Sequence, residues 1–327
     1  MKSNGRQAVD GKRTAAGNAD GIKAQAGASM KKKQWIGSFL LLLTAMIWGT
    51  AFAFQRVGMD HIGPMTFTAS RMTLAAAAVG GVSCLRKRAP ARTDEAKKRA
   101  HSTLAGGAMC GAFLALASIF QQMGIVSTSA GKAGFITALY ILLVPVIGFV
   151  FFGRRNPWPV WLAVLLGVAG MYLLCVKERI ALASGDALLC VCAVLFSGHI
   201  LCCDHFASRG DPVRISFVQF LTAALIAWAA AFLTESPGWD QLSSALVPIL
   251  YCGVVSGGIG YTLQLVAQKY TDPTVASLLM SLEAVFAVIA GALLLNERMT
   301  GRELAGCGIM LAAIVIVQVP MLRKGKA

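Results

Sequence analysis

The stretch that decides the fold is Ala133-Gly134-Phe135-Ile136, because it returns later in the chain as Ala276-Ser277-Leu278-Leu279, shifted by 143 residues without a gap. Near the start, a shift of 148 residues aligns Pro64 with Pro212 in the same way. The chain therefore repeats itself once. If each copy holds an odd number of membrane spans, the second copy enters the bilayer with the opposite orientation. Inverted repeats of this kind are typical of alternating-access carriers, whose binding site lies near the bilayer midplane between the repeats.

The composition predicts a membrane protein. Hydrophobic residues make up 56% of the 327 residues, charged residues only 14%, and the mean hydropathy is +0.66, which is too apolar for a soluble domain of this length. A helix needs about 20 apolar residues to cross the hydrocarbon core. Ten segments meet this requirement: 36–56, 64–85, 103–126, 129–153, 158–176, 187–204, 213–233, 243–268, 274–295 and 301–319. We therefore predict an all-α integral membrane protein with ten transmembrane helices, arranged as two inverted five-helix repeats.

The positive charges predict on which side each loop lies. With the N-terminus inside, 23 of the 30 Lys and Arg residues fall on the cytoplasmic side and 6 on the outer side, while Arg71 lies within a segment. This asymmetry predicts a multi-pass protein of the cell inner (plasma) membrane with both termini cytoplasmic. The predicted order is a disordered basic tail (1–34), the first repeat (35–176), the second repeat (185–320) and a cytoplasmic tail (321–327).

The charge and the cysteines bound the possible partners. The net charge of +15 fits attraction to anionic lipid rather than to nucleic acid, since the basic residues flank apolar segments without interleaved aromatics. The nine cysteines lie in or beside apolar segments, and their spacings match no usual zinc pattern. The sequence also lacks the Gly-x4-Gly-Lys-Ser/Thr loop that cradles ATP phosphates. We expect no cofactor, no metal and no nucleic acid, but membrane lipid and a small-molecule substrate as partners.

Several motifs occur together in the order found in a known family. They are MIWGTAF at 46–52, Pro64 followed by Arg71, SAGKAGFITALY at 129–140 with Pro145 after it, and LLNERMT at 294–300 with Gly306 after it. In this order they resemble the EamA branch of the drug/metabolite transporter superfamily, over roughly residues 36 to 320. The resemblance implies ten helices in two inverted repeats, a central substrate cavity, and movement of small metabolites without ATP hydrolysis. It also implies a structural role for Arg71.

The chain departs from this family pattern in two places. The fourth segment ends in Gly153-Arg154-Arg155 where the family typically has an acidic residue, whereas the ninth segment keeps Glu297. The ninth segment reads Ser281-Leu282-Glu283-Ala284 where a proline is common in the family. The missing proline puts a helix break in the second half in doubt, and Glu283 places a carboxyl group in the membrane.

Glu283 is the strongest candidate for substrate binding. It lies nine residues into its segment, about 14 Å deep, where an ionised side chain costs roughly 2.5–3.5 kcal/mol. A position facing lipid is therefore disfavoured, and the 143-residue shift pairs Glu283 with Tyr140. The carboxyl group could bind a substrate amine or carry a proton. The alternative is a glutamate that only locks helices together.

Other polar residues are weaker candidates for the wall of a substrate cavity. Tyr261 and Gln264 lie on one helical stripe, and either Gln121 or Gln122 of the third segment falls opposite Gln264. Interhelical hydrogen bonding is the alternative role for this stripe. Trp48 and His199 lie near the middle of the first and sixth segments, where packing inside the bundle would also explain them.

Glycine and proline residues mark candidate hinge or packing positions. Gly107 and Gly111 in the third segment, and Gly253 and Gly257 in the eighth, permit close approach of neighbouring helices. Pro145 removes a backbone hydrogen bond within the fourth segment and favours a kink there.

These observations predict a secondary transporter, not an enzyme, that moves small metabolites by alternating access, with amino acids or related amphiphiles as the expected substrates. Proton coupling through Glu283 is one option for its driving force. The alternative is an intramembrane enzyme that acts on a lipid-borne substrate, which would use Glu283 and His199. A nucleophile paired with a base is not recognisable in the sequence, and an enzyme gives no reason for an inverted repeat.

Overall fold

The structure is a computed structural model that describes residues 33–85, 94–127, 130–175, 184–295 and 300–323. Every regular element in these ranges is a helix. Of the predicted tails at 1–34 and 321–327, residues 1–32 and 324–327 lie outside these ranges, and so does Glu297, which follows the ninth segment. The side chains of Lys132 and Cys175 are likewise not described.

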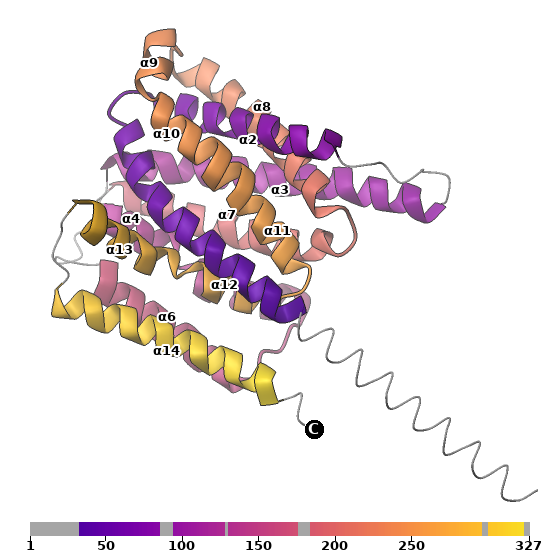
Figure 1. Ribbon diagram of the computed structural model, residues 1–327, viewed down its shortest axis with the longest axis vertical. Helices are drawn as coiled ribbons and strands as arrows, with labels where there is room; N and C mark the ends of the chain where they lie inside the picture. The colour runs from indigo at the N-terminus through magenta and orange to yellow at the C-terminus, as the bar shows by residue number, and fades with distance from the viewer. Residues whose placement is uncertain (1–32, 86–93, 128–129, 176–183, 296–299, 324–327) are drawn as a thin grey trace, which may run out of the picture.

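The helices follow the predicted segments closely (Figure 1). After a first helix over Lys33–Gly58, they are α2 (Pro64–Leu85), α3 (Asp94–Ser127), α4 (Ala130–Thr137), α5 (Tyr140–Phe152), α6 (Trp158–Cys175), α7 (Ser184–Ala207), α8 (Pro212–Thr234), α9 (Trp239–Ser244), α10 (Leu246–Leu250), the π-helix η1 (Tyr251–Tyr261), α11 (Thr262–Gln268), α12 (Pro273–Met280), α13 (Glu283–Leu295) and α14 (Gly301–Arg323). α3 begins nine residues before the predicted segment, because Asp94 and Glu95 in its first turn favour a helix start.

Six helical stretches among the described residues are long and apolar enough to cross a membrane. They are Lys33–Gly58, Asp94–Ser127, Ala133–Phe152, Gly185–Ala207, Pro212–Thr234 and Leu246–Gln268, and two shorter apolar stretches cover Trp158–Leu174 and Pro273–Ile289. Large apolar side chains such as Phe151, Leu225 and Leu233 are exposed on the outside of the bundle. An apolar exterior of this extent is expected for a protein surrounded by lipid.

Small residues allow the helices to approach one another closely. α6 packs along α14 at one side of the bundle (Figure 1), and there a Cβ on Gly170 would lie 2.8 Å from the carbonyl oxygen of Gly306. Gly107 and Gly111 of α3 lie against α8, and Gly253 and Gly257 of η1 lie against α2. The four candidate packing glycines therefore lie at helix crossings.

Two of the predicted segments are interrupted in their middle. The fourth is divided at Ala138 and Leu139 into α4 and α5, and the ninth at Ser281 and Leu282 into α12 and α13. The interruption of the ninth segment, which the missing proline had put in doubt, is therefore present. The hydroxyl of Ser281 donates to the carbonyl of Leu278 at 2.8 Å, and such a bond competes with the helical pattern without any proline.

The first interruption does not coincide with the proline of its segment. Pro145 lies inside α5, and Ala138 and Leu139 precede it. At the interruption the amide of Ile141 bonds to the carbonyl of Ala138 at 3.0 Å, which is the tighter i to i+3 pattern of a 3₁₀ turn.

α2 and α8 begin alike but are capped differently. Both start with a proline at the first helical position, and Asp211 caps α8 by accepting from the next two available backbone amides. α2 has Gly63 at the corresponding position, and the carboxylate of Glu235, which follows α8, caps it instead. A side chain on Gly63 would overlap that carboxylate. The start of α2 is therefore fixed to the end of α8.

Candidate functional site

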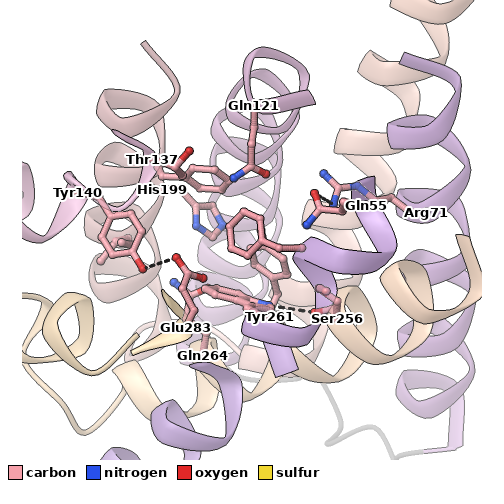
Figure 2. A pocket seen from close by; sticks show the side chains of 15 residues that line it. Gln55, Arg71, Gln121, Thr137, Tyr140, His199, Ser256, Tyr261, Gln264 and Glu283 are labelled. Carbon is pink, nitrogen blue, oxygen red and sulfur yellow. Dashed lines mark hydrogen bonds between the residues drawn. The ribbon is translucent and has the colours of Figure 1, made fainter. Parts of the chain in front are cut away.

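A buried cavity lies at the centre of the bundle (Figure 2). It is bounded by the first helix, α2, α3, α4, α5, α7, η1, α11 and α13, so segments from the whole length of the chain meet there. Its wall consists of Trp48, Ala51, Phe52, Gln55, Arg71, Gln121, Thr137, Tyr140, Phe196, His199, Ile200, Ser256, Tyr261, Gln264 and Glu283. The cavity volume is about 40 Å³, enough for about three water molecules.

One side of the cavity is formed by Tyr140 and Glu283, the first residues after the two helix interruptions. The hydroxyl of Tyr140 donates to Glu283 Oε1 at 3.0 Å, and the two side chains are only 4% and 6% exposed (Figure 2). Glu283 lies in the first turn of α13, where the helix dipole favours a negative charge. Gly49 lets the first helix lie against this point, because a Cβ there would be 2.5 Å from the carbonyl oxygen of Glu283.

Arg71 and Gln55 lie across the cavity from Glu283 (Figure 2). Arg71 is 6% exposed, and its Nη1 donates to Gln55 Oε1 at 3.1 Å. Its guanidinium carbon is 5.7 Å from the centre of the Phe67 ring. Within the described ranges, the buried Arg71 Nε has no hydrogen-bond partner. The guanidinium group therefore keeps unused donors inside the bundle.

Aromatic rings form the wall between these two sides. Trp48 donates from Nε1 to the carbonyl of Ser256 at 3.2 Å, and its ring centroid is 4.5 Å from that of Tyr261. His199 packs edge-on against the same Tyr261 at 5.7 Å and contacts Gln219 through Nε2 at 3.2 Å. Ser256 belongs to the π-helix η1, so this hydrogen bond joins Trp48 to η1. π-helical turns occur often at functional sites.

Gln264 completes the wall with both polar atoms of its side-chain amide unpaired. Gln264 is 1% exposed, and among the described residues neither its Nε2 nor its Oε1 has a hydrogen-bond partner. Buried polar groups are normally satisfied, so these atoms are available to water or to a bound molecule.

The structure places seven of the eight predicted substrate-binding residues in this wall: Trp48, Gln121, Tyr140, His199, Tyr261, Gln264 and Glu283. Gln122 is fully buried outside it, with Nε2 3.9 Å from the sulfur of Met59. Sequence reasoning missed Gln55, Thr137 and Ser256. A glutamine inside the apolar first segment was a usable signal for Gln55, whereas Ser256 acts through its backbone and has none.

A second polar cavity lies at the end of the bundle where α5 and α7 terminate. Arg154 Nη2 donates to Asp204 Oδ2 at 2.7 Å, and the two side chains are 38% and 17% exposed. The cavity volume is about 430 Å³, and its wall consists of Lys33, Gln34, Arg154, Asp204, Gln268, Lys269, Tyr270, Thr271, Asp272 and Pro273. Across the described ranges no group of three His, Cys, Asp or Glu side chains could hold a metal ion.

Comparison with known proteins assigns the family. The sequence profile of the EamA-like transporter family matches residues 35–176 and 183–319. The chain belongs to this family. The EamA-like protein is 27% identical over 300 residues to an uncharacterized transporter of Archaeoglobus fulgidus, with 90% of each chain covered. It is 24% identical over 293 residues to a probable terminal-alkyne amino-acid exporter of Streptantibioticus cattleyicolor, covering 80% of this chain and 94% of the relative.

A crystal structure with 17% sequence identity has the same fold as this EamA-like protein, with a TM-score of 0.72 over 89% of this chain and 98% of the other. The family and the named relatives make the EamA-like protein a multi-pass membrane transporter of small molecules and not an enzyme. The alternative of an intramembrane enzyme is thereby removed.

Proposed function

We propose that this EamA-like transporter is a secondary carrier that moves a small metabolite across the inner membrane by alternating access of two inverted five-helix repeats, residues 35–176 and 185–320. The observation that carries this proposal is the hydrogen bond between Tyr140 and Glu283 at the centre of the bundle. The two residues are 143 positions apart, which is the shift that relates the two halves of the sequence. When two halves are related by a twofold axis, residues at equivalent positions of the two halves can contact each other only close to that axis.

The helix interruptions obey the same relation. α4 ends at Thr137 and α5 begins at Tyr140, while α12 ends at Met280 and α13 begins at Glu283. A shift of 143 residues moves each boundary of the first pair onto the corresponding boundary of the second. Interrupted helices at the repeat interface are the usual site of substrate binding in transporters built from inverted repeats.

The helix contacts and the family match support the two halves. α2 packs against α8 and α6 against α14, and in both pairs one helix is the counterpart of the other under the predicted repeat. The two stretches matched by the family profile also have nearly the bounds proposed for the repeats. Both findings favour a twofold relation between the halves.

The ion pair between Arg154 and Asp204 is the contact that we propose closes the carrier on its cytoplasmic side. It joins the end of the first half's fourth segment to α7 of the second half, on the side that the positive charges predict to be cytoplasmic. The central cavity has room for only about three water molecules, so we propose that this state is a closed one. Opening the cytoplasmic side would require this ion pair to separate.

Glu283 is the proposed group for a substrate amine, which makes amino acids or related amphiphiles the substrates that we propose. The name of the Streptantibioticus cattleyicolor relative, an amino-acid exporter, supports this class. Glu283 could also carry a proton across the membrane. The two roles are separable by experiment, since only the second requires a response to a pH gradient.

Purified full-length protein in liposomes tests the proposal. Uptake of labelled amino acids and cationic metabolites is measured with and without a pH gradient, against protein-free liposomes. We expect uptake of at least one solute, its reduction by Glu283→Gln, and no effect of Glu95→Gln, which removes an exposed carboxylate at the start of α3. Uptake driven by the gradient that persists in Glu283→Gln would refute proton carriage by this residue. No solute movement at all would refute the transporter proposal.

The orientation has a separate test. Cys84 at the end of α2 is exposed and is predicted to lie on the cytoplasmic side, while Gly238, in the connection between α8 and α9, is predicted to lie outside. A membrane-impermeant maleimide added to intact cells should label Gly238→Cys but not Cys84, and should label both after the membrane is opened. Labelling of Cys84 alone in intact cells would reverse the topology.

A further inference from the structure

The central cavity contains one basic and one acidic side chain that do not neutralise each other. Arg71 and Glu283 both line it, lie on different sides of it in Figure 2, and form no ion pair with each other. Over the described part of the chain, Arg71 is held by the neutral Gln55 and Glu283 by the neutral Tyr140. A buried charge is costly unless it is paired, and neither Gln55 nor Tyr140 supplies an opposite charge.

Arg71 is poorly suited to a purely structural role. Its guanidinium group carries five N–H donors in a planar fork that matches a carboxylate. Among the described residues Gln55 is its one hydrogen-bond acceptor, and Nε has none although the side chain is nine-tenths buried. An arginine that served only to join helices would be expected to use its donors on backbone carbonyls or on a carboxylate of the protein. Arg71 instead lines the cavity.

We propose that Arg71, held by Gln55, is the carboxylate-binding end of the cavity, and that the substrate is a zwitterion whose carboxylate lies at Arg71 and whose ammonium group lies at Glu283. This inference rests on the proposed transport function and deepens it by adding the anionic half of the substrate. A zwitterion supplies each buried charge with its counter-charge in one binding event. Tyr261 lies between the two ends (Figure 2), Trp48 packs against it, and both rings line the cavity, where they would contact the apolar part of the ligand.

The predicted selectivity for zwitterions requires both Arg71 and Glu283. A simple amine would satisfy Glu283 but leave Arg71 unpaired, and a simple carboxylate would do the reverse. Since an unpaired buried charge is penalised, the site should reject analogues that lack either charge more strongly than it distinguishes side chains of similar size. This penalty separates the zwitterion site from a site that recognises amines alone.

The test uses the full-length protein in liposomes and four labelled zwitterions: L-alanine, L-leucine, L-phenylalanine and γ-aminobutyrate. Each is compared with its carboxamide, which keeps only the positive charge, and with its deaminated acid, which keeps only the negative charge. We expect at least one zwitterion to be transported roughly ten- to a hundredfold better than both of its analogues. The preferred member also reports the charge separation that fits between Arg71 and Glu283.

Failure of the inference is distinguishable from failure of the proposed function. If carboxamides or other cationic metabolites are carried as well as the zwitterions, or if only other solutes are carried, the protein is a transporter but the anionic end is refuted. If no solute moves in any set, both proposals fail.

Variants locate the effect at Arg71. Arg71→Gln should abolish the preference for a zwitterion over its carboxamide, which loss of packing alone would not do, and Gln55→Leu should weaken that preference about fivefold. Arg209→Gln is the matched control, because Arg209 is exposed and bonds only to the carbonyl of His205. Monodisperse elution of each variant in size-exclusion chromatography confirms that it is folded. If Arg71→Gln does not fold, the comparison of zwitterions with their analogues on the unmutated protein still tests the proposal. A preserved preference in folded Arg71→Gln would overturn the assignment.

Discussion

The cap of α2 offers a quantitative test of how the helices are joined. Glu235 Oε1 accepts from the amide of Met65 at 2.9 Å, and Oε2 accepts from the amide of Thr66 at 2.9 Å and from its hydroxyl at 2.6 Å. Loss of a helix cap costs about 0.5–2 kcal/mol, and a hydrogen bond to a charged group contributes about 1.5–3 kcal/mol. Because Glu235 is half-buried, water can replace part of these bonds. We expect Glu235→Ala to lower the free energy of unfolding by about 2 kcal/mol.

A compensating substitution follows from the difference between α2 and α8. Gly63→Asp alone should lower the free energy of unfolding by about 1–2 kcal/mol, because its side chain overlaps the Glu235 carboxylate and repels its charge. In the Glu235→Ala background the same substitution should recover about 1 kcal/mol, since it creates the Asp-Pro start with which Asp211 caps α8 at 3.1 and 3.2 Å.

Unfolding by sodium dodecyl sulfate in mixed micelles, followed by tryptophan fluorescence, measures these differences in free energy. Asp240→Ala is the control, because Asp240 is an exposed carboxylate in α9 close to Glu235 in sequence. If Glu235→Ala is no more destabilising than this control, Glu235 does not cap α2. If the double variant is no more stable than Glu235→Ala, the proposed correspondence between the starts of α2 and α8 is wrong.

Three further outcomes are expected. Gly306→Ala should destabilise the protein by about 1–3 kcal/mol in the same titration, because its Cβ would lie 2.6 Å from a backbone oxygen of α6. Gly308→Ala has nothing within 4 Å of its Cβ and should be neutral or stabilising by up to about 1 kcal/mol. Equal effects of the two substitutions would contradict the packing of α6 on α14. Tyr140→Phe should slow uptake in liposomes about tenfold, because it removes the hydrogen bond from the Tyr140 hydroxyl to the buried carboxyl group of Glu283, and unchanged uptake would contradict that contact. Arg154→Asp should increase maleimide access to the central cavity from the cytoplasmic side, because it breaks the ion pair with Asp204. Adding Asp204→Arg should reverse this increase. Access that stays high in the double variant would show that the ion pair does not close the cytoplasmic side.

The helical segments were predictable because they depend on composition and on strong local signals. α2 was predicted at 64–85 and begins at Pro64, since proline is favoured at the first helical position, and its described residues extend to Leu85. The seven predicted residues in the cavity wall were found for a similar reason. A polar or aromatic side chain in the middle of an apolar segment is costly facing lipid, so it must face the interior of the bundle.

The failures have equally local causes. Gln121 and Gln122 could not be told apart, because adjacent residues point about 100° apart and either could have faced the cavity. Arg71 was given a structural role by resemblance alone, and its unused donors become visible only when its neighbours are placed. The break at Ser281 was put in doubt because only proline was considered as its cause, whereas a serine hydroxyl bonded to the helix backbone accompanies it here.

The contact between Tyr140 and Glu283 suggests how substrate binding would act on the two halves. Under the proposed repeats the hydrogen bond crosses from one half to the other, so rocking of the halves must stretch or move it. A carboxylate has room for several donors, so an ammonium group can bind Glu283 while Tyr140 stays in place. With a carboxylate at Arg71, the ligand would connect α13 of the second half to α2 of the first. A zwitterion would therefore strengthen the interface between the halves, whereas an amine would contact Glu283 alone. The charges of Arg71 and Glu283, which select the substrate, would then also decide when the two halves can rock.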